Sequence, residues 1–480
     1  MLFSSILFLF YFFPVVFLVN YLLSFSRFAQ NLWLFIVSIV FYAWGEPVLV
    51  LIMLFSIVAN TVFGILVDKY RLNAVKVKII LVITCVFNLS FLFVYKYLGF
   101  VVQNINGIFG KTLIDFAGFA LPLGISFYTF QAMSYVIDVY RKDAKVEKNP
   151  FYVGLYVAFF PQLVAGPIVR YTDVAEQIRG RKATWNMVSS GCCRFITGVG
   201  KKILISNAMA TIADHIFNLS AMSGSETIVP VSLAWLGILA YTLQIYFDFS
   251  GYSDMAIGLG RMFGFEFLEN FNYPYVADSI VDFWRRWHIS LSTWFREYVY
   301  FPLGGSRVAN NDLMVRNTFI VWLLTGIWHG AEWAFLLWGM WNFAFIMLER
   351  IINFGELPIP KVFKHIYSLL IIGIGWMFFR AGDLYQAFLY LRNILGMNSN
   401  GFASDITVMF LREYWIFLAA GILFSMPIAP RISQVIKKRA MGNWSAVFNI
   451  AYPAVLMLIM IISVTYLAKG SYNPFIYFNF

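Results

Sequence analysis

Apolar residues dominate this chain in long runs, which short polar or basic segments separate. A helix rises 1.5 Å per residue, so about twenty apolar residues cross the roughly 30 Å hydrocarbon core of a bilayer. Runs of about this length lie near residues 2–24, 30–45, 48–67, 79–97, 117–139, 186–218, 231–262, 317–349, 366–380, 412–428 and 447–468. The pattern predicts an all-α polytopic membrane protein with about eleven transmembrane helices, folded as one domain over residues 1–480.

Basic residues in the connecting segments predict the orientation of the helices. Segments 68–78 and 141–148 are rich in Lys and Arg, whereas segment 98–116 contains almost none. Because basic loops stay in the cytoplasm, the N-terminus is expected outside, residues 217–232 form an outside loop and residues 431–440 form an inside loop. The first apolar run is expected to be kept as a span rather than removed as a signal peptide.

Two segments depart from the pattern of simple spans. Residues 151–170 are apolar but contain Pro161 and Pro167, and the basic residues 179–182 follow. A full crossing would place those basic residues outside, so we expect a re-entrant segment whose broken backbone is buried in protein or lines a cavity. Residues 279–307 mix Arg with Trp and are expected to form short helices at the cytoplasmic interface.

Composition agrees with a membrane protein and narrows the function. Hydrophobic residues make up 61% of the chain and charged residues 12%, whereas soluble domains contain about a quarter charged residues. The formal net charge of +11 favours contact with anionic membrane lipid, and the sequence shows no polar basic groove suited to nucleic acid. We therefore expect membrane lipid, and no nucleic acid, among the partners.

An ionisable residue inside an apolar run is costly and indicates a functional site. His329 lies near the middle of the apolar stretch 322–343, with Glu332 three residues further on. Burial keeps an imidazole neutral, so that a ring nitrogen can accept the proton of an attacking hydroxyl as a general base. The structural alternative is a core histidine whose hydrogen bonds are satisfied within the protein, for example by Glu332 one turn further along the helix. His288, placed among aromatic residues, becomes a candidate as a partner of His329.

Arginines surround His288 in the sequence. Arg285, Arg286 and Arg296 lie among the tryptophans of residues 284–296. Their guanidinium groups could anchor short helices at the lipid headgroups. Alternatively, they bind the phosphates of an acyl donor such as coenzyme A, or an acidic carrier protein, through charge-assisted hydrogen bonds.

Asp248 and Asp254 are further candidates for buried carboxylates. Their six-residue spacing separates them by about 240° on a helix, so they do not form a facing acid pair. We expect structural roles for both, either neutralisation of Arg261 or capping of a broken helix, rather than catalysis.

Other classes of active site do not fit the sequence. The GVGKK segment at 198–202 lacks the first glycine and the final Ser or Thr of a phosphate-binding loop. Ser253, in GYSDM, lacks the last glycine of a nucleophile elbow. The four histidines are widely spread, and the three cysteines form no C-x-x-C pair. We expect no metal site and no permanently bound cofactor.

Two segments resemble the signature segments of the membrane-bound O-acyltransferase family. They are WRRWHISLSTWFREYVYFPLGG (284–305) and TGIWHGAEWAFLLWG (325–339). The chain is most similar to the bacterial alginate O-acetyltransferase branch, and the resemblance extends to residues 121–141, 159–171, 246–275 and 473–480. It implies a ring of helices around a central tunnel, with re-entrant and interfacial helices. It also implies that His329 is the catalytic histidine and His288 a supporting one.

The resemblance further implies an enzyme of the bacterial inner membrane that O-acetylates an exported polysaccharide, such as alginate or another exopolysaccharide. The expected donor is a cytoplasmic thioester, either acetyl-CoA or an acyl carrier protein. A separate extracytoplasmic acetyltransferase of the SGNH type often completes the transfer in this branch, so such a partner is expected. His329 would act as general base, and His288 would orient the donor or stabilise developing negative charge.

Three alternatives remain. The related teichoic acid D-alanylation branch would transfer a D-alanyl or other acyl group from a carrier protein to a cell-wall polymer. A transporter of polysaccharide precursors would also use broken helices, but it predicts inverted repeats that the sequence does not show. A structural subunit of an export complex would not need a buried histidine pair.

Overall fold

The computed structural model describes residues 1–222, 229–308, 310–439, 444–470 and 472–476, and within these residues the regular structure is entirely helical. Eight helices in the described part are long and apolar enough to cross a membrane. They lie at Phe8–Phe25, Val50–Lys69, Ala74–Phe109, Val231–Met262, Trp333–Ile351, Lys361–Arg380, Asp405–Phe424 and Ile450–Ala468. This confirms the all-α polytopic class. The count of about eleven spans, the ring and the tunnel stay predictions. Of the expected outside loop at 217–232, residues 223–228 lie outside the described residues.

The chain divides into two compact units. The first comprises residues Met1–Phe195 and Ser253–Leu268, and the second Ile196–Tyr252 and Glu269–Phe480. The expectation of one domain stays a prediction.

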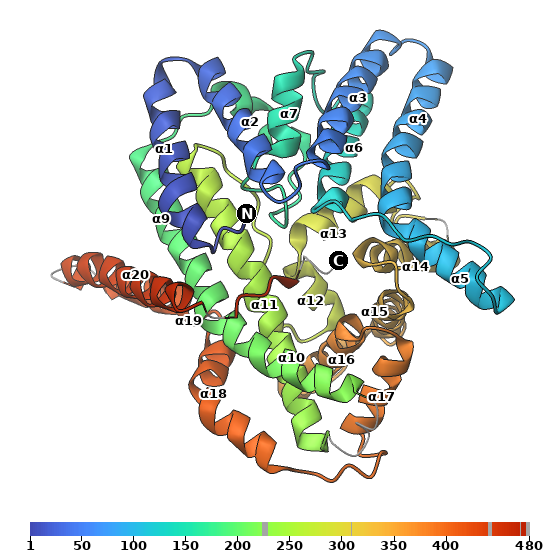
Figure 1. Ribbon diagram of the computed structural model, residues 1–480, viewed down its shortest axis with the longest axis vertical. Helices are drawn as coiled ribbons and strands as arrows, with labels where there is room; N and C mark the ends of the chain where they lie inside the picture. The colour runs from blue at the N-terminus through green and yellow to red at the C-terminus, as the bar shows by residue number, and fades with distance from the viewer. Residues whose placement is uncertain (223–228, 309, 440–443, 471, 477–480) are drawn as a thin grey trace. The chain divides into compact units, whose positions relative to one another are not determined.

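The first unit contains the N-terminal helices (Figure 1). They are α1 (Phe13–Leu22), α2 (Arg27–Ala43), α3 (Val50–Lys69), α4 (Ala74–Leu92), α5 (Leu98–Phe109), α6 (Ile125–Arg141), α7 (Pro150–Ala158), α8 (Tyr171–Gly180) and most of α9 (Trp185–Gly200). Helices α3, α4 and α6 pack against one another. Asn60 of α3 and Asn88 of α4 exchange two side-chain hydrogen bonds of 3.0 and 2.8 Å, which satisfy buried amides that lipid could not.

The expected broken segment is present after α7. The helix ends at Ala158, and residues 159–170 are irregular. Residues 153–169 are all buried, which is the condition under which broken backbone is tolerated at membrane depth. Gly166 fits here because a Cβ would lie 2.5 Å from the Cα of Gln162. The break is therefore confirmed, and its re-entrant path through the membrane stays a prediction.

The second unit contains the remaining helices. They are α10 (Asn207–Ala221), most of α11 (Val231–Met262), α12 (Ile280–Arg286), α13 (Ile289–Phe295), α14 (Asn311–His329), α15 (Trp333–Ile351), α16 (Lys361–Arg380), α17 (Leu384–Ile394), α18 (Asp405–Phe424), α19 (Ile428–Arg439) and α20 (Trp444–Ala468). A π-helical turn, η7 (Arg296–Tyr300), extends α13. The short helices expected within residues 279–307 are confirmed as α12, α13 and η7.

Two predictions about elements in this unit are wrong. Residues 317–349 do not form one span, because the helix stops at His329 and α15 starts at Trp333. The two form an antiparallel hairpin, in which Arg350 donates to the Oγ1 atom of Thr318 at 3.4 Å. Residues 431–440 were expected to be a loop, but residues up to Arg439 belong to α19.

The partner predicted for the buried aspartates is also wrong. Asp248 pairs with Lys202 in the second unit at 2.6 Å, and Asp254 pairs with Arg194 in the first unit at 2.9 Å. Neither ion pair involves Arg261. The structural role expected for both carboxylates agrees with these contacts.

Candidate active site

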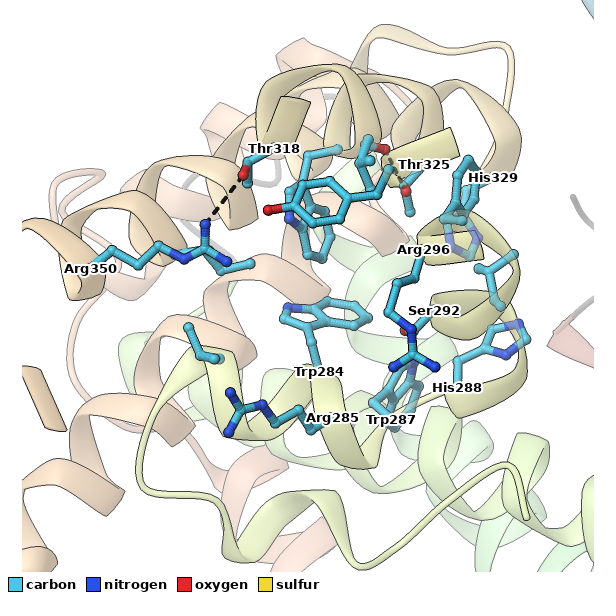
Figure 2. Close-up of a pocket in the computed structure, with 17 residues that line it drawn as sticks. Trp284, Arg285, Trp287, His288, Ser292, Arg296, Thr318, Thr325, His329 and Arg350 are labelled. Carbon is cyan, nitrogen blue, oxygen red and sulfur yellow. Dashed lines mark hydrogen bonds between the residues drawn. The ribbon is translucent and has the colours of Figure 1, made fainter. Parts of the chain in front are cut away.

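A cavity of about 260 Å³ lies within the second unit, between the short helices that follow α11 and the α14–α15 hairpin (Figure 2). Its wall is largely aromatic and aliphatic, with a few polar groups. The lining residues are Val281, Trp284, Arg285, Trp287, His288, Leu291, Ser292, Phe295, Arg296, Tyr300, Thr318, Val321, Trp322, Thr325, His329, Ile346 and Arg350. Both histidines expected at the site therefore line one cavity.

One face of α14 forms a side of the cavity. Thr318, Val321, Trp322, Thr325 and His329 recur at intervals of three or four residues, which places them on one face of a helix. Eleven residues separate Thr318 from His329, or about 16 Å at the rise of an α-helix. The cavity is thus elongated, with Arg350 beside Thr318 at one end and His329 at the other.

His329 is the last residue of α14 and is 6% exposed. Its ring makes edge-to-face contacts with three aromatic rings, those of Trp328, Trp338 and Phe379, with centroids 4.9 to 5.1 Å away. Glu332 lies beyond the break, where it is exposed and precedes the first residue of α15. Glu332 is therefore not a hydrogen-bond partner one turn along a single helix, and a core histidine with other partners stays the structural alternative.

Glycines let α14 and α15 approach closely enough to hold His329 in place. A Cβ on Gly339 would lie 2.7 Å from the carbonyl oxygen of Trp322, and a Cβ on Gly326 would lie 2.8 Å from that of Phe335. Both obstacles are backbone atoms, which cannot rotate away. The small residues in this stretch thus serve helix packing, as is common between membrane helices.

His288 precedes α13 and is 2% exposed. Its φ of 44° lies in the left-handed region, which is unfavourable for a residue with a Cβ. Its Nδ1 atom lies 3.1 Å from the Oδ1 atom of Asn270, and its ring packs edge-on against Phe249 at 4.6 Å. Burial lowers the pKa of His288 to about 3, so the imidazole is neutral at physiological pH. His288 lies outside the eight candidate spans.

The ring of Trp328 packs against the rings of both histidines. Its ring centroid lies 4.9 Å from that of His329 and 6.2 Å from that of His288. Both imidazoles are thus held by aromatic packing rather than by exposed polar loops. Rigid packing of this kind keeps catalytic groups within the narrow tolerance that a reaction needs.

Three arginines give the cavity a positive charge. Arg285, Arg296 and Arg350 line it, and among the described lining residues none is Asp or Glu. Arg286 does not line the cavity, because its Nε atom donates to Asp282 one turn earlier at 2.8 Å. Two of the three arginines proposed from the sequence thus line the cavity, and Arg350, which was not proposed, lines it too.

Tyr300 and Asn270 were not predicted from the sequence as residues of the site. Tyr300 lines the cavity, and its buried hydroxyl has no hydrogen-bond partner among the described residues. Asn270 lies outside the cavity wall and contacts His288. Both lie within segments that carry the family resemblance, but residue type alone did not distinguish them from their neighbours.

A second cavity of about 240 Å³ shares Val281 and Arg350 with the first. Glu349 lies in its wall and accepts hydrogen bonds from the backbone N–H groups of Ile280 and Val281, at 2.6 and 3.0 Å. These bonds satisfy amides at the start of α12, which would otherwise be buried without partners. Arg350 therefore lies at the junction of two adjoining spaces.

Comparison with known proteins identifies the family of the chain. The family model described as MBOAT, membrane-bound O-acyltransferase family, matches residues 39–391. A probable alginate O-acetylase AlgI from Azotobacter vinelandii is 38% identical over 100% of both chains. A protein of the same name from Pseudomonas aeruginosa is 43% identical over 81% of this chain and 73% of its own. A peptidoglycan O-acetyltransferase from Helicobacter pylori is 35% identical over 83% of this chain and 80% of its own. The chain therefore belongs to the membrane-bound O-acyltransferase family, and it is a multi-pass membrane enzyme that transfers acyl groups to oxygen.

Proposed function

We propose that this enzyme takes an acetyl group from acetyl-CoA on the cytoplasmic side and passes it through the membrane for O-acetylation of an exported polysaccharide. The main support is the cavity itself, whose wall combines three arginines, a largely apolar stretch and two buried histidines. The resemblance of the chain to proteins named alginate O-acetylase and peptidoglycan O-acetyltransferase supports a polysaccharide acceptor.

The length of the cavity suits the pantetheine arm of the donor. This arm joins a phosphate to the sulfur through about thirteen bonds, which at roughly 1.2 Å each in an extended chain give about 16 Å. The face of α14 from Thr318 to His329 covers about the same distance. A phosphate near Arg350 would then place the thioester near His329.

The charges on the cavity wall suit an anionic donor. Arginine binds phosphate oxygens through charge-assisted hydrogen bonds, which are stronger than neutral ones. Arg285, Arg296 and Arg350 supply these donors, and no carboxylate among the described lining residues opposes them.

In the proposed reaction, the oxygen of an acceptor hydroxyl attacks the carbonyl carbon of the thioester. His329 takes the hydroxyl proton as the C–O bond forms, and the C–S bond then breaks. The leaving thiolate receives that proton and departs as coenzyme A. Because the thioester already has a good leaving group, no nucleophile from the protein is needed.

The cavity favours an acetyl group over the D-alanyl group of the alternative. A D-alanyl thioester bears an ammonium group, which would enter a cavity lined, among the described residues, by three arginines and no carboxylate. Like charges repel, and the exposure of the three arginine side chains reduces this repulsion without reversing its sign. An acetyl group is neutral and meets no such penalty.

The acceptor could receive the acetyl group directly or through a partner. By its resemblance to the alginate branch, we propose that the enzyme works in the bacterial inner membrane. An extracytoplasmic SGNH-type acetyltransferase would then complete the transfer to the sugar. An acyl carrier protein remains the alternative donor, since it presents the same phosphopantetheine arm.

Cleavage of radiolabelled acetyl-CoA by purified protein in nanodiscs tests the proposal. Wild type is expected to release coenzyme A, and His329→Ala is expected to lose about 10²- to 10⁴-fold in rate, the usual contribution of a general base. His215→Ala is the matched control, because His215 is exposed and does not line the cavity.

Near-native turnover by His329→Ala would refute the role of His329. Absence of cleavage by wild type, even with an acceptor polysaccharide and the SGNH-type partner present, would refute acetyl-CoA as the donor. Acyl carrier protein would then be tried as the thioester.

A further inference from the structure

Asn270 accepts hydrogen bonds from the backbone N–H groups of the two residues that follow His288. Its carbonyl oxygen accepts a hydrogen bond from the N–H group of Ile289 at 3.0 Å. Its side-chain Oδ1 atom accepts one from the N–H group of Ser290 at 3.2 Å. These bonds hold the two residues that follow His288, whose own backbone is in the left-handed conformation. An unfavourable conformation persists where the surroundings impose it, and such positions concentrate at functional sites.

The same contacts determine which ring nitrogen of His288 bears the proton. The N–H group of Ser290 can only donate, so the side-chain atom of Asn270 that it faces must be the oxygen rather than the nitrogen. The hydroxyl of Ser290 donates to that oxygen as well, at 2.9 Å. Because an amide oxygen can only accept, the Nδ1 atom of His288, 3.1 Å away, must be protonated. In the neutral ring, Nε2 then has a lone pair and no hydrogen.

The Nε2 atom is buried and has no hydrogen-bond partner among the described residues. Several other buried side-chain atoms of the described residues also lack a partner, so the place of His288 in the wall of the cavity is what makes Nε2 a candidate acceptor. His288 lines the cavity that we assign to the donor and the reacting hydroxyl. A ligand that donates a hydrogen bond would satisfy this atom.

We propose that Asn270 is a positioning residue that holds His288 in the Nδ1–H tautomer, so that Nε2 accepts a hydrogen bond from the attacking hydroxyl. This inference rests on the proposed role of the cavity. In this tautomer His288 cannot donate to a developing oxyanion, so its role is to orient the nucleophile. His329 remains the group that removes the proton.

His288 stays neutral, in the Nδ1–H tautomer, because no carboxylate among the described residues contacts its ring. The residues in contact with its ring are neutral, namely Asn270, Ser290, Phe249 and Trp328. The charged or titratable groups that share the cavity wall are Arg285, Arg296, Arg350, Tyr300 and His329. Burial disfavours a positive charge on His288. A carboxylate placed at position 270 would reverse this balance.

Asn270→Asp and Asn270→Ala separate tautomer control from simple support of the backbone. The aspartate keeps an acceptor for Nδ1–H but adds a negative charge beside the ring, which raises the pKa of His288. As the pH falls through that raised pKa, Nε2 becomes protonated and can no longer accept. The acid side of the profile of kcat against pH is therefore expected to move to higher pH in Asn270→Asp.

Asn270→Ala removes the acceptor, so both tautomers become populated. We expect kcat to fall about 10- to 100-fold, the usual effect of removing a group that orients a histidine. The KM for acetyl-CoA should stay near its wild-type value, since Asn270 does not line the cavity. Asn270→Asp at a pH above the raised pKa should recover most of the lost kcat.

Nitrogen NMR of protein labelled with ¹⁵N in its four histidine rings gives a readout that does not depend on activity. Comparison with the spectrum of His288→Gln assigns the signals of His288. The wild type is expected to show the Nδ1–H tautomer, Asn270→Ala an average of both tautomers, and Asn270→Asp a titration at higher pH. Asn272→Asp, which adds the same charge at an exposed position, is expected to show neither change.

Two results would overturn the proposal. One is a wild-type His288 with its proton on Nε2. The other is an Asn270→Ala variant that is folded, by its thermal unfolding, and keeps both the wild-type tautomer and the wild-type kcat. If wild type fails to cleave acetyl-CoA with the acceptor and the SGNH-type partner present, the proposed donor is wrong, but the NMR spectra still decide the tautomer of His288.

Discussion

Arg350 is the residue through which the donor's charge is best tested. Its side chain is exposed, donates to Thr318 at 3.4 Å and lies where the two cavities meet. A hydrogen bond to a charged group contributes about 1.5–3 kcal/mol, and exposure reduces this. We expect Arg350→Gln to raise the KM for acetyl-CoA about 10-fold with little change in kcat, since the contact is made before and during the reaction alike. Initial rates over a range of acetyl-CoA concentrations measure both constants.

Arg286→Gln is the control for this experiment. Arg286 is a neighbour of Arg285 in sequence, but it pairs with Asp282 and does not line the cavity. Its replacement should leave the KM close to the wild-type value. Equal effects of the two variants would mean that the arginines act through the overall positive charge of the surface rather than at a phosphate site. Added salt would then weaken both effects alike.

The sequence predicted the reactive residues of this site better than the residues that hold them. His329 and His288 were predicted as site residues because an ionisable residue is costly in an apolar environment. Arg350 was not predicted, because it lies at the end of an apolar run, where a basic residue commonly faces headgroups. Asn270 bonds to His288 across eighteen residues of chain, and such a contact cannot be inferred from local pattern. The stabilising partners are visible only once the backbone is folded.

At the scale of elements, the α14–α15 hairpin determines where His329 lies. Gly339 of α15 faces the backbone of Trp322 and Gly326 on α14, and a Cβ there would lie 2.7 Å from a carbonyl oxygen. Gly339→Ala is expected to destabilise the protein by about 1–3 kcal/mol, the usual cost of overpacking. It should also lower the rate of donor cleavage, because the helices must separate and His329 ends one of them. Thermal unfolding and cleavage assays on the same preparation test both effects.

Gly107→Ala is the matched control for Gly339→Ala. Gly107 lies in helix α5, and a Cβ built there meets nothing within 4 Å. Alanine is favoured over glycine inside a helix by up to about 1 kcal/mol, so stability should stay equal or rise slightly. A folded, fully active Gly339→Ala protein would show that the close approach of α14 and α15 does not position His329.

The hairpin also shows why some elements could not be predicted from hydropathy. The break at residues 330–332 contains one charged residue, Glu332, and no proline, and both sides of it are apolar. Hydropathy averaged over 317–349 therefore predicts a single long span. By contrast, 231–262 was predicted with its boundaries correct, because polar residues precede it in the sequence, and Arg261 and Gly264 mark its end. Hydropathy locates helix ends well where polar residues flank the helix and poorly where a short turn joins two apolar helices.

In the second unit, a buried ion pair between two early helical segments also binds the last described residues of the chain by hydrogen bonds. Lys202 and Asp248 are each 2% exposed and lie 2.6 Å apart. Lys202 also donates to the carbonyl oxygen of Pro474, and Asp248 accepts from the N–H group of Ile476 at 2.9 Å. The segment near the C-terminus is thereby fixed against helices more than two hundred residues earlier. Asp248, which the sequence marked as structural, thus serves long-range assembly.

Breaking this pair tests how much the assembly of the second unit depends on it. Lys202→Met leaves a buried carboxylate without its counter-charge, which typically costs about 3–5 kcal/mol. The double variant Lys202→Met/Asp248→Leu removes both charges and should be more stable than Lys202→Met. It should remain below wild type, because the N–H group of Ile476 loses its acceptor. Thermal unfolding in detergent gives the order of the variants.

Asp68→Asn, which breaks a pair whose side chains are 32% and 40% exposed, is the control and should cost at most about 1 kcal/mol. If the double variant is as unstable as the sum of its single variants, the two charges are not coupled, and the C-terminal segment is held by its apolar contacts alone.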